Sequence, residues 1–381
     1  MTRLVLKFGG SSVADLDKIK HAARLVMSHA QSAEVVVVVS AMKGETNRLL
    51  ALAKKVHNPL VPNREFDQIM ATGEIVSASL MALSLESLGL KAMSLTGMQA
   101  GIQTNDLHQD ASIQSIQSDC IKKAIEQGVI PVVTGFQGYC DDHVTTLGRG
   151  GSDLTAVALA HALDAENCWI YTDVKGVYPI DPNIVPNHDV FEQIGYKTMM
   201  QMAKAGAEVI QYAAIDYAFK YQVPVRVCST FEPGIGTLVN QRNVFDKPII
   251  VKSSGLTKIA CKYTEQDKYQ DLFANHILHA NEDCLLLNML LPEIKTKLRL
   301  VHATDVIESI LPNQTLISIF MPSDQWFDLF SDGVAALTFA TILESDNNQQ
   351  LRVMVPDYKM TAVLTQLHQM TQVSQKLMTC D

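Results

Sequence analysis

A glycine-rich stretch in the middle of the chain combines residue types that bind anionic groups. Residues 145–153 read TTLGRGGSD, and the three glycines allow a tight turn that brings backbone N–H groups close to a ligand. An apolar helical pattern follows from Leu154 to Leu163, so Ser152 or Asp153 is predicted to be the N-cap, with a ligand at the positive end of the helix. Arg149 adds a planar guanidinium suited to a carboxylate or a phosphate. The alternative is an ordinary glycine-rich loop with a solvated ion pair.

A second anion-binding pattern lies near the N-terminus. The short apolar run Leu4–Leu6 is followed by Lys7, Phe8 and two glycines. Two glycines after a strand expose backbone N–H groups, and a lysine at the strand end supplies a point charge. The sequence has neither a G-x-x-x-x-G-K-[ST] motif nor a G-x-G-x-x-G motif after this strand, which argues against a Walker-type loop and a dinucleotide fold. The alternative is that Lys7 is a surface residue at a sheet edge.

The elements that must position these residues alternate between strands and helices. Val35–Val39 is an unbroken β-branched run, as expected for a strand buried on both faces of a parallel sheet. Polar or glycine-rich residues follow each predicted strand, and ligands bind at that edge of an α/β sheet. We therefore predict an open, mostly parallel α/β sheet flanked by helices. Further strands are predicted at Ala92–Leu95, Ile130–Val133 and Cys168–Tyr171, and helices at Asp15–His29, after Asn47 and around Gly73-Glu74.

Composition and charge exclude several classes of protein. The 381 residues are 47% hydrophobic and 19% charged, so the chain can bury large cores and is long enough for two or three domains. A net charge of −9 without a basic block argues against a nucleic-acid partner. The seven cysteines include no C-x-x-C pair, and no apolar run reaches the length of a membrane span. We expect a soluble, cytoplasmic protein with no membrane partner.

Three motifs together resemble the aspartate kinases of the amino acid kinase superfamily. They are Lys7–Val13, the loop Thr145–Asp153, and Thr172–Tyr178 with the sequence TDVKGVY. Four further stretches fit the same family in the same order: Ser40–Met42, Gly73-Glu74, Thr96–Gly101 and Gly135–Gly138. The resemblance covers residues 1 to about 240.

The resemblance implies transfer of the γ-phosphoryl group of ATP to the side-chain carboxylate of L-aspartate. The product is 4-phospho-L-aspartate, in the first step of lysine, threonine and methionine biosynthesis. Such a transfer depends on positioning and charge neutralisation. Lys7 would lie between the transferring phosphoryl group and the nucleotide phosphates, and Gly9 and Gly10 would donate backbone N–H groups. Asp153 would orient Lys7 and the substrate without acting as a base, because a carboxylate nucleophile is already ionised at neutral pH.

The same resemblance implies the binding residues. Arg149 would hold a substrate carboxylate together with the backbone of Gly150, Gly151 and Ser152. Thr46 and Glu74 would complete the amino-acid pocket, with Glu74 at the α-ammonium group. The residues implied for the nucleotide are Lys7, Phe8, Gly9, Gly10, Ser40, Thr172, Asp173, Tyr178 and Asn183.

Other interpretations of these residues remain open. Thr46 is also suited to capping the following helix, Glu74 to a first helical turn where the dipole favours a carboxylate, and Tyr178 to packing. Mg²⁺ is expected to bridge phosphates and water, so no protein ligand to the metal is assigned.

Two positions depart from the family's pattern. Where the family usually has an arginine, the chain has Asn183, and where it usually has a lysine, the chain has Glu208. Both cations normally face the nucleotide phosphates, and each such contact is worth about 1–3 kcal/mol. Either other cations compensate or nucleotide binding is weakened. The candidates for compensation are Lys175, Lys197 and Lys204.

The second part of the chain looks like the paired ACT domains that follow the kinase domain of aspartate kinases. The expected domains are an amino acid kinase domain over residues 1–242 and tandem α+β, ferredoxin-like ACT-type domains over 247–381. The resemblance implies an amino-acid effector and a homodimer or higher homo-oligomer. Strands are predicted at Thr257–Tyr263, Leu285–Leu291, Lys297–Val301, Leu316–Met321 and Leu351–Val355, and helices at Gln266–His279, Thr304–Ile310, Asp324–Ala340 and Tyr358–Met370.

Three functions are consistent with the sequence. The first is an aspartate kinase with ATP and Mg²⁺. The second is a kinase of the same fold that acts on another amino-acid carboxylate. The third is a ligand-binding regulator with weakened catalysis, which the replacements at Asn183 and Glu208 would explain.

Overall fold

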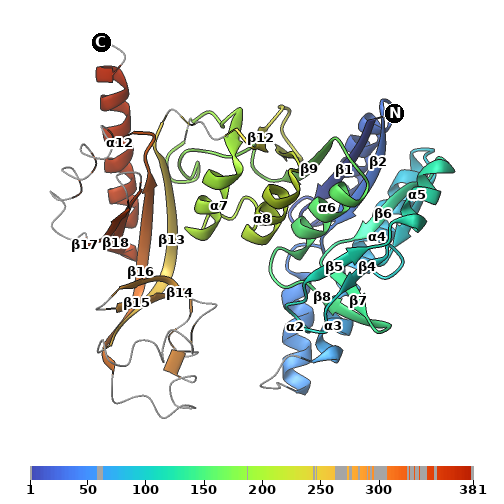
Figure 1. Ribbon diagram of the computed structural model, residues 1–381, viewed down its shortest axis with the longest axis horizontal. Helices are drawn as coiled ribbons and strands as arrows, with labels where there is room; N and C mark the ends of the chain where they lie inside the picture. Colours follow the sequence, from blue (N-terminus) through green and yellow to red (C-terminus); the bar gives the residue numbers. More distant parts are fainter. Residues whose placement is uncertain are drawn as a thin grey trace. The chain divides into compact units, whose positions relative to one another are not determined.

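The computed structural model divides into two compact units (Figure 1). The first unit comprises Met1–Val177, Val190–Met200 and Glu208–Asn243, and the second comprises Tyr178–Asp189, Gln201–Ala207 and Val244–Asp381. The two units therefore interleave along the chain, and the second takes in two segments that precede residue 242. The residues that the structure describes are 2–57, 63–186, 188–242, 245, 247–261, 273, 277–281, 284–289, 291, 294–295, 307–323, 326, 330, 334, 341–346 and 350–378.

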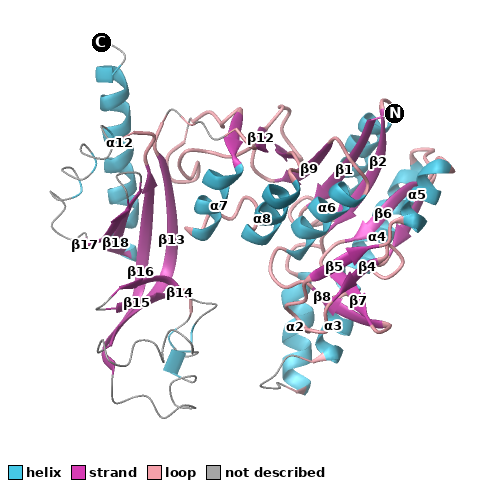
Figure 2. Ribbon diagram, viewed as in Figure 1, coloured by secondary structure: helices cyan, strands magenta, loops and turns pink. Residues whose placement is uncertain are grey.

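Eight strands form the main sheet of the first unit, in the order β10-β12-β11-β9-β1-β2-β6-β3. Figure 2 shows strands such as β1, β2 and β6 in magenta, with helices in cyan beside them. Neighbouring strands are parallel except for β11 and β12. The mostly parallel sheet and its buried central strand Val35–Val39 confirm the predicted fold class. The strand bounds are β1 Thr2–Phe8, β2 Ala33–Val39, β3 Ala92–Leu95, β6 Ile130–Thr134, β9 Asn167–Thr172, β10 Gln193–Gly195, β11 Val225–Ser229 and β12 Thr237–Asn240.

A second sheet of four short strands lies in the same unit, in the order β5-β4-β7-β8. Its last strand, β8, ends at Thr146, immediately before the glycine-rich loop. This sheet is not predictable from the sequence, because strands of three or four mixed residues carry little hydrophobic periodicity. The bounds are β4 Ile102–Thr104, β5 Ile113–Ile116, β7 Gln137–Cys140 and β8 His143–Thr146.

Helices cover both faces of the main sheet. α1 begins after the N-cap Asp15, whose side chain accepts a hydrogen bond from the Lys18 N–H, and it buries Ile19, Ala22, Ala23 and Val26 at helical spacing. Leu6 and Phe8 of β1 pack in one core with residues of α1 and α4, whereas β1 also packs against α6. The helix bounds are α1 Leu16–Ala30, α2 Glu45–Val56, α3 Arg64–Met70, α4 Thr72–Ser87, α5 Asp119–Glu126, α6 Gly151–Ala162, α7 Tyr196–Lys204 and α8 Tyr212–Tyr221.

One stretch in the described part of the chain, Arg64–Ser87, is long and apolar enough to span a membrane by length and composition. It consists of α3 and α4, and α4 packs against α1, β3 and β6. Half of the apolar window is buried inside the protein. We interpret these helices as core elements of the first unit.

The second unit contains a six-stranded antiparallel sheet in the order β14-β15-β13-β16-β18-β17. An α+β unit of this kind is consistent with ACT-type domains. A 3₁₀ turn at Asp357–Lys359 leads into α12, Met360–Met378, which confirms the predicted C-terminal helix. The strand bounds are β13 Ile249–Cys261, β14 Ile277–Asn281, β15 Cys284–Leu287, β16 Ile307–Phe320, β17 Thr341–Asp346 and β18 Gln350–Pro356.

Several predicted elements of this unit need correction. The helix predicted at Thr304–Ile310 is wrong from residue 307, because Ile307–Ile310 belong to β16 and pair with β13. Ile277–His279 form part of β14 and not a helix. β15 ends at Leu287, short of the predicted Leu291. The strand predicted at Lys297–Val301 lies outside the described residues, as do most of the helices predicted at 266–279 and 324–340.

Candidate active site

An ion pair between Lys7 and Asp153 joins the end of β1 to the first turn of α6. Side chains alternate along a strand, so Lys7 points away from the core that takes Leu6 and Phe8 and toward α6. Both side chains of the pair are only 10% exposed. Two charges buried together avoid most of the cost of burying either one alone. The structure thus brings together the two residues predicted to be catalytic.

The predicted N-cap of α6 is wrong. Gly150 takes that position, with φ of +75° in the left-handed region and without a side-chain hydrogen bond to the helix, and Ser152 and Asp153 lie in the first turn. A Cβ on Gly150 would lie 2.1 Å from Cγ of Gln211, so only glycine fits. Arg149, which precedes this cap, is exposed and makes no ion pair with any residue that the structure describes. The helix N-terminus and the guanidinium therefore remain open to an anion.

Glu74 is a buried carboxylate in the first turn of α4. Its Oε1 accepts a hydrogen bond from the Ala41 N–H at 2.9 Å, whereas its Oε2 is buried with no hydrogen-bond partner among the described residues. Burial raises the pKa of Glu74 to about 7, because the charged form loses its hydration. Glu74 lies in the first turn of α4, where the helix dipole favours a carboxylate, but its side chain is buried away from water. A buried oxygen without a donor is suited to a ligand ammonium group.

Close packing brings these motifs to one edge of the main sheet. A Cβ on Gly10 would lie 3.0 Å from the Ala41 carbonyl, and a Cβ on Gly73 would lie 2.9 Å from the Ala41 Cβ. On the α6 side, a Cβ on Gly135 would lie 2.7 Å from Ser152. The turns after β1, β2 and β6 therefore meet the N-termini of α4 and α6 at the carboxyl ends of parallel strands, where the sequence predicted a ligand.

The residues at the turn after β1 differ in what they offer to a ligand. The Gly9 N–H already donates to the Tyr171 carbonyl at 3.1 Å, so it is not a free donor as predicted, whereas the Gly10 N–H has no acceptor among the described residues. The Phe8 side chain is fully buried and stacks on Tyr171 with ring centroids 5.0 Å apart. The Ser40 N–H donates to the Phe8 carbonyl at 3.0 Å. Only backbone atoms of Phe8 can face a nucleotide.

The remaining predicted nucleotide residues fall in both units. Thr172 follows the buried part of β9, and its hydroxyl donates to Asp173 at 3.1 Å. Tyr178 and Asn183 belong to the second unit, where the Asn183 N–H donates to the Asp181 carboxylate at 2.9 Å.

The structure also describes Glu208, one of the two departures from the family pattern, and Lys175, one of the candidate compensating cations. Glu208 is exposed in the first unit. Lys175 pairs with Glu232 at 2.8 Å, so it is not a free compensating cation.

Thr46 does not cap α2. The N-cap is Gly44, again in the left-handed region, and Thr46 lies half-buried inside the first turn. Its hydroxyl is therefore not required for capping. In the part of the chain that the structure describes, no three His, Cys, Asp or Glu side chains are grouped as metal ligands.

Asp67 of α3 is a completely buried carboxylate that was not among the predicted site residues. The signal was present in the sequence: Asp67 is the one acidic residue on the buried face of α3, between Phe66 and Met70. Burying a charge is costly without partners, so an acid on an apolar face indicates a polar cluster.

Comparisons with known proteins agree with this geometry. The model of the amino acid kinase family matches residues 2–229. An aspartate kinase of Pseudomonas putida is 45% identical over 255 residues, which are 66% of this chain and 62% of that protein. An aspartokinase of Geobacillus stearothermophilus is 45% identical over 251 residues, 65% of this chain and 61% of that protein. The chain thus covers less than two thirds of the length of these relatives.

The crystal structure of Escherichia coli aspartokinase III in complex with aspartate and ADP is similar in fold. Its TM-score is 0.78 at 23% identity, over 97% of this chain and 99% of that chain. The T-state structure of aspartokinase III with lysine and aspartate gives a TM-score of 0.74 at 23% identity, over 97% and 99% of the two chains. The family match over more than half of the chain, together with the Lys7–Asp153 pair at the expected sheet edge, shows that this protein belongs to the amino acid kinase family.

Proposed function

We propose that the protein is an aspartate kinase, an ATP-dependent phosphotransferase that forms 4-phospho-L-aspartate. The observation that carries the proposal is the buried Lys7–Asp153 pair, which joins the turn after β1 to the helix that follows Arg149. Each partner comes from a different motif of the resemblance. The relatives at 45% identity are aspartate kinases, which favours aspartate over another acceptor.

The reaction needs charge neutralisation in a defined geometry. An oxygen of the substrate's side-chain carboxylate forms a bond to the γ-phosphorus, the bond from that phosphorus to the β–γ bridging oxygen breaks, and ADP leaves with the electron pair. Lys7 neutralises the phosphoryl oxygens as charge moves between them, and the Gly10 N–H donates to a phosphate oxygen. Asp153 holds the ammonium group of Lys7 at this position. No general base is required.

The amino-acid acceptor has two further charges that the site can match. The buried, unpaired oxygen of Glu74 suits the α-ammonium group, and the exposed guanidinium of Arg149 suits a carboxylate in a bidentate arrangement. The N–H groups of Gly150 and Ser152 and the hydroxyl of Thr46 would supply neutral donors. The Gly151 N–H already donates to the Gly148 carbonyl at 3.1 Å, so it is not a free donor as predicted.

ATP would lie along the turn after β1 and the end of β9. Its phosphates would contact Lys7 and Gly10, with the backbone of Phe8, Gly9 and Ser40 shaping the turn and Thr172 and Asp173 along the nucleotide. The resemblance to the family adds Tyr178 and Asn183 to the proposed nucleotide residues. The residues present fit a phosphate group, because the open N–H of Gly10 and the ammonium group of Lys7 are anion-binding groups. Mg²⁺ would be held by phosphates and water, and it would supply further neutralisation of the phosphate charge.

We extend the proposal to regulation and assembly. The second unit would act as ACT-type domains that bind an amino-acid effector, and lysine is a candidate because a solved aspartokinase III contains lysine in its T-state. The protein would be cytoplasmic, would feed lysine, threonine and methionine synthesis, and would form a homodimer or higher homo-oligomer. Domain bounds at 1–242 and 247–381 remain part of the proposal.

An assay of ATP turnover with L-aspartate tests the proposed function. Trapping the acyl phosphate with hydroxylamine should give aspartyl hydroxamate for the wild type, and Lys7→Ala should lower kcat by about 10²–10³-fold, since Lys7 acts on developing charge. Lys20→Ala, an exposed lysine of α1, is the matched control and should behave as the wild type. Absence of turnover at any Mg-ATP concentration would refute the kinase activity. A substrate panel in which another carboxylate outperforms aspartate would refute the assigned acceptor.

A further inference from the structure

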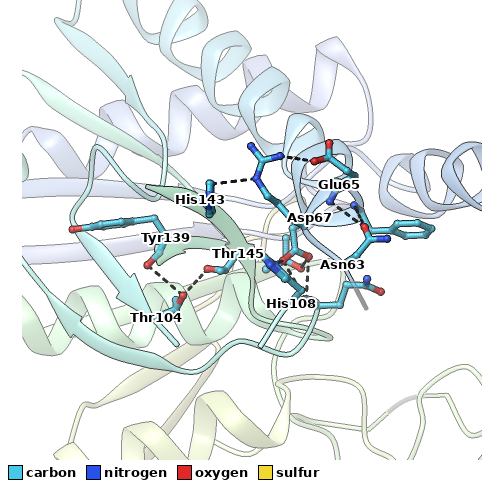
Figure 3. Close-up of polar contacts among 12 residues, drawn as sticks. Asn63, Glu65, Asp67, Thr104, His108, Tyr139, His143 and Thr145 are labelled. Carbon is cyan, nitrogen blue, oxygen red and sulfur yellow. Dashed lines mark hydrogen bonds and ion pairs between the residues drawn. The ribbon is translucent and has the colours of Figure 1, made fainter. Parts of the chain in front are cut away.

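A buried carboxylate has no part in the reaction proposed above and lies beside the Arg149 loop, residues Leu147–Gly150 between β8 and α6. Asp67 of α3 is completely buried. It accepts a hydrogen bond from the Thr146 hydroxyl at 2.6 Å, and the Gln109 N–H donates to its two oxygens at 3.1 and 3.3 Å. Its second oxygen also contacts Nδ1 of His108 at 2.7 Å (Figure 3). Three partners from two other segments contact this carboxylate, so it holds those segments in fixed positions next to α3.

Both of those segments lead to the loop that carries Arg149. Thr146 is the last residue of β8, and the loop begins directly after it. Gln109 has a φ of +65°, and its carbonyl lies 3.1 Å from the place of a Cβ on Gly148. The Ala111 N–H donates to the Thr146 carbonyl at 2.9 Å. By holding Gln109 and Thr146 together, Asp67 fixes the point from which the loop starts and the segment against which Gly148 packs.

Asp67 is also connected to Glu74 through a short rigid path. α3 ends at Met70, and α4 begins at Thr72, so Glu74 lies two turns along the chain from Asp67. The Ala71 carbonyl between the two helices accepts a hydrogen bond from Nε2 of Gln137 at 3.0 Å. The position of α3 therefore couples the Arg149 loop to the helix that presents Glu74.

We propose that Asp67 is a positioning residue that sets the spacing between Arg149 and Glu74, and hence the affinity for the amino-acid acceptor. The inference rests on the proposed function, in which these two residues bind opposite charges of L-aspartate. Asp67 makes no hydrogen bond or ion pair with Lys7 or Gly10, the groups assigned to the phosphates. Loss of the Asp67 interactions should therefore weaken the binding of L-aspartate and leave ATP binding nearly unchanged.

Variants of the Asp67–Thr146 hydrogen bond test this specificity. Thr146→Val removes the hydroxyl without a change in volume, and Asp67→Asn removes the charge. Both should raise the KM for L-aspartate about tenfold or more, because displacing Arg149 and Glu74 weakens their charged contacts with the acceptor and so lowers its binding affinity. The KM for ATP should stay within about twofold. Thr146→Ser keeps the hydroxyl and should restore the wild-type KM for aspartate.

A matched control lies in the same sheet. The hydroxyls of Thr104 and Thr145 form a buried hydrogen bond of 2.6 Å that is not connected to Asp67 (Figure 3). Thr104→Val should disturb packing as much as Thr146→Val while leaving the KM for aspartate unchanged. An equal rise in this control would show a general packing effect and overturn the proposal.

Hydrogen exchange supplies a readout that does not depend on turnover. Amide exchange at Gln109 should become faster in Asp67→Asn and Thr146→Val and stay slow in Thr104→Val, because the Gln109 N–H donates to Asp67. If the wild type phosphorylates aspartate and both variants keep its KM, the positioning role is wrong while the proposed function stands. If the wild type does not phosphorylate aspartate, the proposed function fails first. Should Asp67→Asn fail to fold, Thr146→Val alone decides.

Discussion

At the scale of single residues, Glu74 has the most unusual electrostatic environment in the site. It is 2% exposed, one of its oxygens has no donor, and burial raises its pKa to about 7 from the ordinary 4.5. A carboxyl group whose folded pKa is raised binds its proton more tightly in the folded state. Its ionisation therefore lowers the free energy of unfolding as the pH rises from about 4.5 through about 7. In the proposed function, the α-ammonium group of the acceptor would neutralise this unfavourable charge.

Glu74→Gln should stabilise the ligand-free protein at high pH. At pH 8 the free energy of unfolding should rise by up to about 3 kcal/mol, since one pKa unit corresponds to ~1.4 kcal/mol, and at pH 4 it should change little. Urea unfolding at the two pH values measures the difference. An equal gain at both values would show that charge burial is not the cause. In the same variant, calorimetry should show weaker binding of L-aspartate and unchanged binding of ATP.

At the scale of elements, the start of α6 depends on glycine at position 150. Gly150→Ala would place a Cβ 2.1 Å from Cγ of Gln211, in addition to the strain of a positive φ. A left-handed alanine costs about 1–2 kcal/mol, so this variant should lose more than that in free energy of unfolding, and turnover should fall because Arg149 and Ser152 shift. Chemical denaturation and steady-state kinetics measure the two effects.

Two further variants separate the causes of that loss. Gly128 has a φ of +67° with nothing within 4 Å of an added Cβ, so Gly128→Ala should show the backbone cost alone. Adding Gln211→Gly to Gly150→Ala removes both close side-chain atoms and should recover the remainder. If Gly150→Ala costs no more than Gly128→Ala, the close contact with Gln211 is not limiting.

At the scale of the whole molecule, the two units are interleaved in sequence, so neither is a simple half of the chain. Ile180 and Val185 precede residue 242 yet are buried in the core of the second unit with Ile250, Ile317 and Phe330. A chain that ends near residue 243 would leave this apolar segment without its core.

Truncation after Asn243 should therefore give a less stable protein that binds a hydrophobic dye such as ANS, in contrast to the full chain. Thermal unfolding and dye fluorescence measure this. Replacing Ile180 and Val185 with serine in the truncated chain should reduce dye binding. A truncated chain with the melting temperature of the full protein and no dye binding would contradict the interpretation.

The charge of the whole molecule bears on nucleotide affinity. The net charge is −9, and the resemblance to the family implies cations at the positions of Asn183 and Glu208. Glu208→Lys combined with Asn183→Arg should lower the KM for ATP by about tenfold or more, because each charged contact to phosphate is worth about 1–3 kcal/mol. The KM for L-aspartate should stay the same. An unchanged KM for ATP would mean that these positions do not face the nucleotide in this protein.

The sequence by itself determined the elements whose signals are local. Val35–Val39 had to be a buried strand, Asp15 had to begin a helix, and the glycines after β1 and β8 had to form turns, because hydrophobic period, capping and φ freedom act over a few neighbouring residues. These signals also gave the sheet edge where Lys7 and Asp153 meet. The order of the motifs along the chain then indicated the amino acid kinase family.

Only the tertiary structure decided which groups are buried, paired or already used. In the structure, Gly150 is the N-cap of α6 and the Gly9 N–H donates to the Tyr171 carbonyl. Residues 307–310, predicted to be helical, belong to β16. The tertiary structure also identified the three partners of Asp67, which come from two segments far from Asp67 in the chain. Burial and pairing depend on contacts between distant residues, and a local pattern cannot encode those contacts.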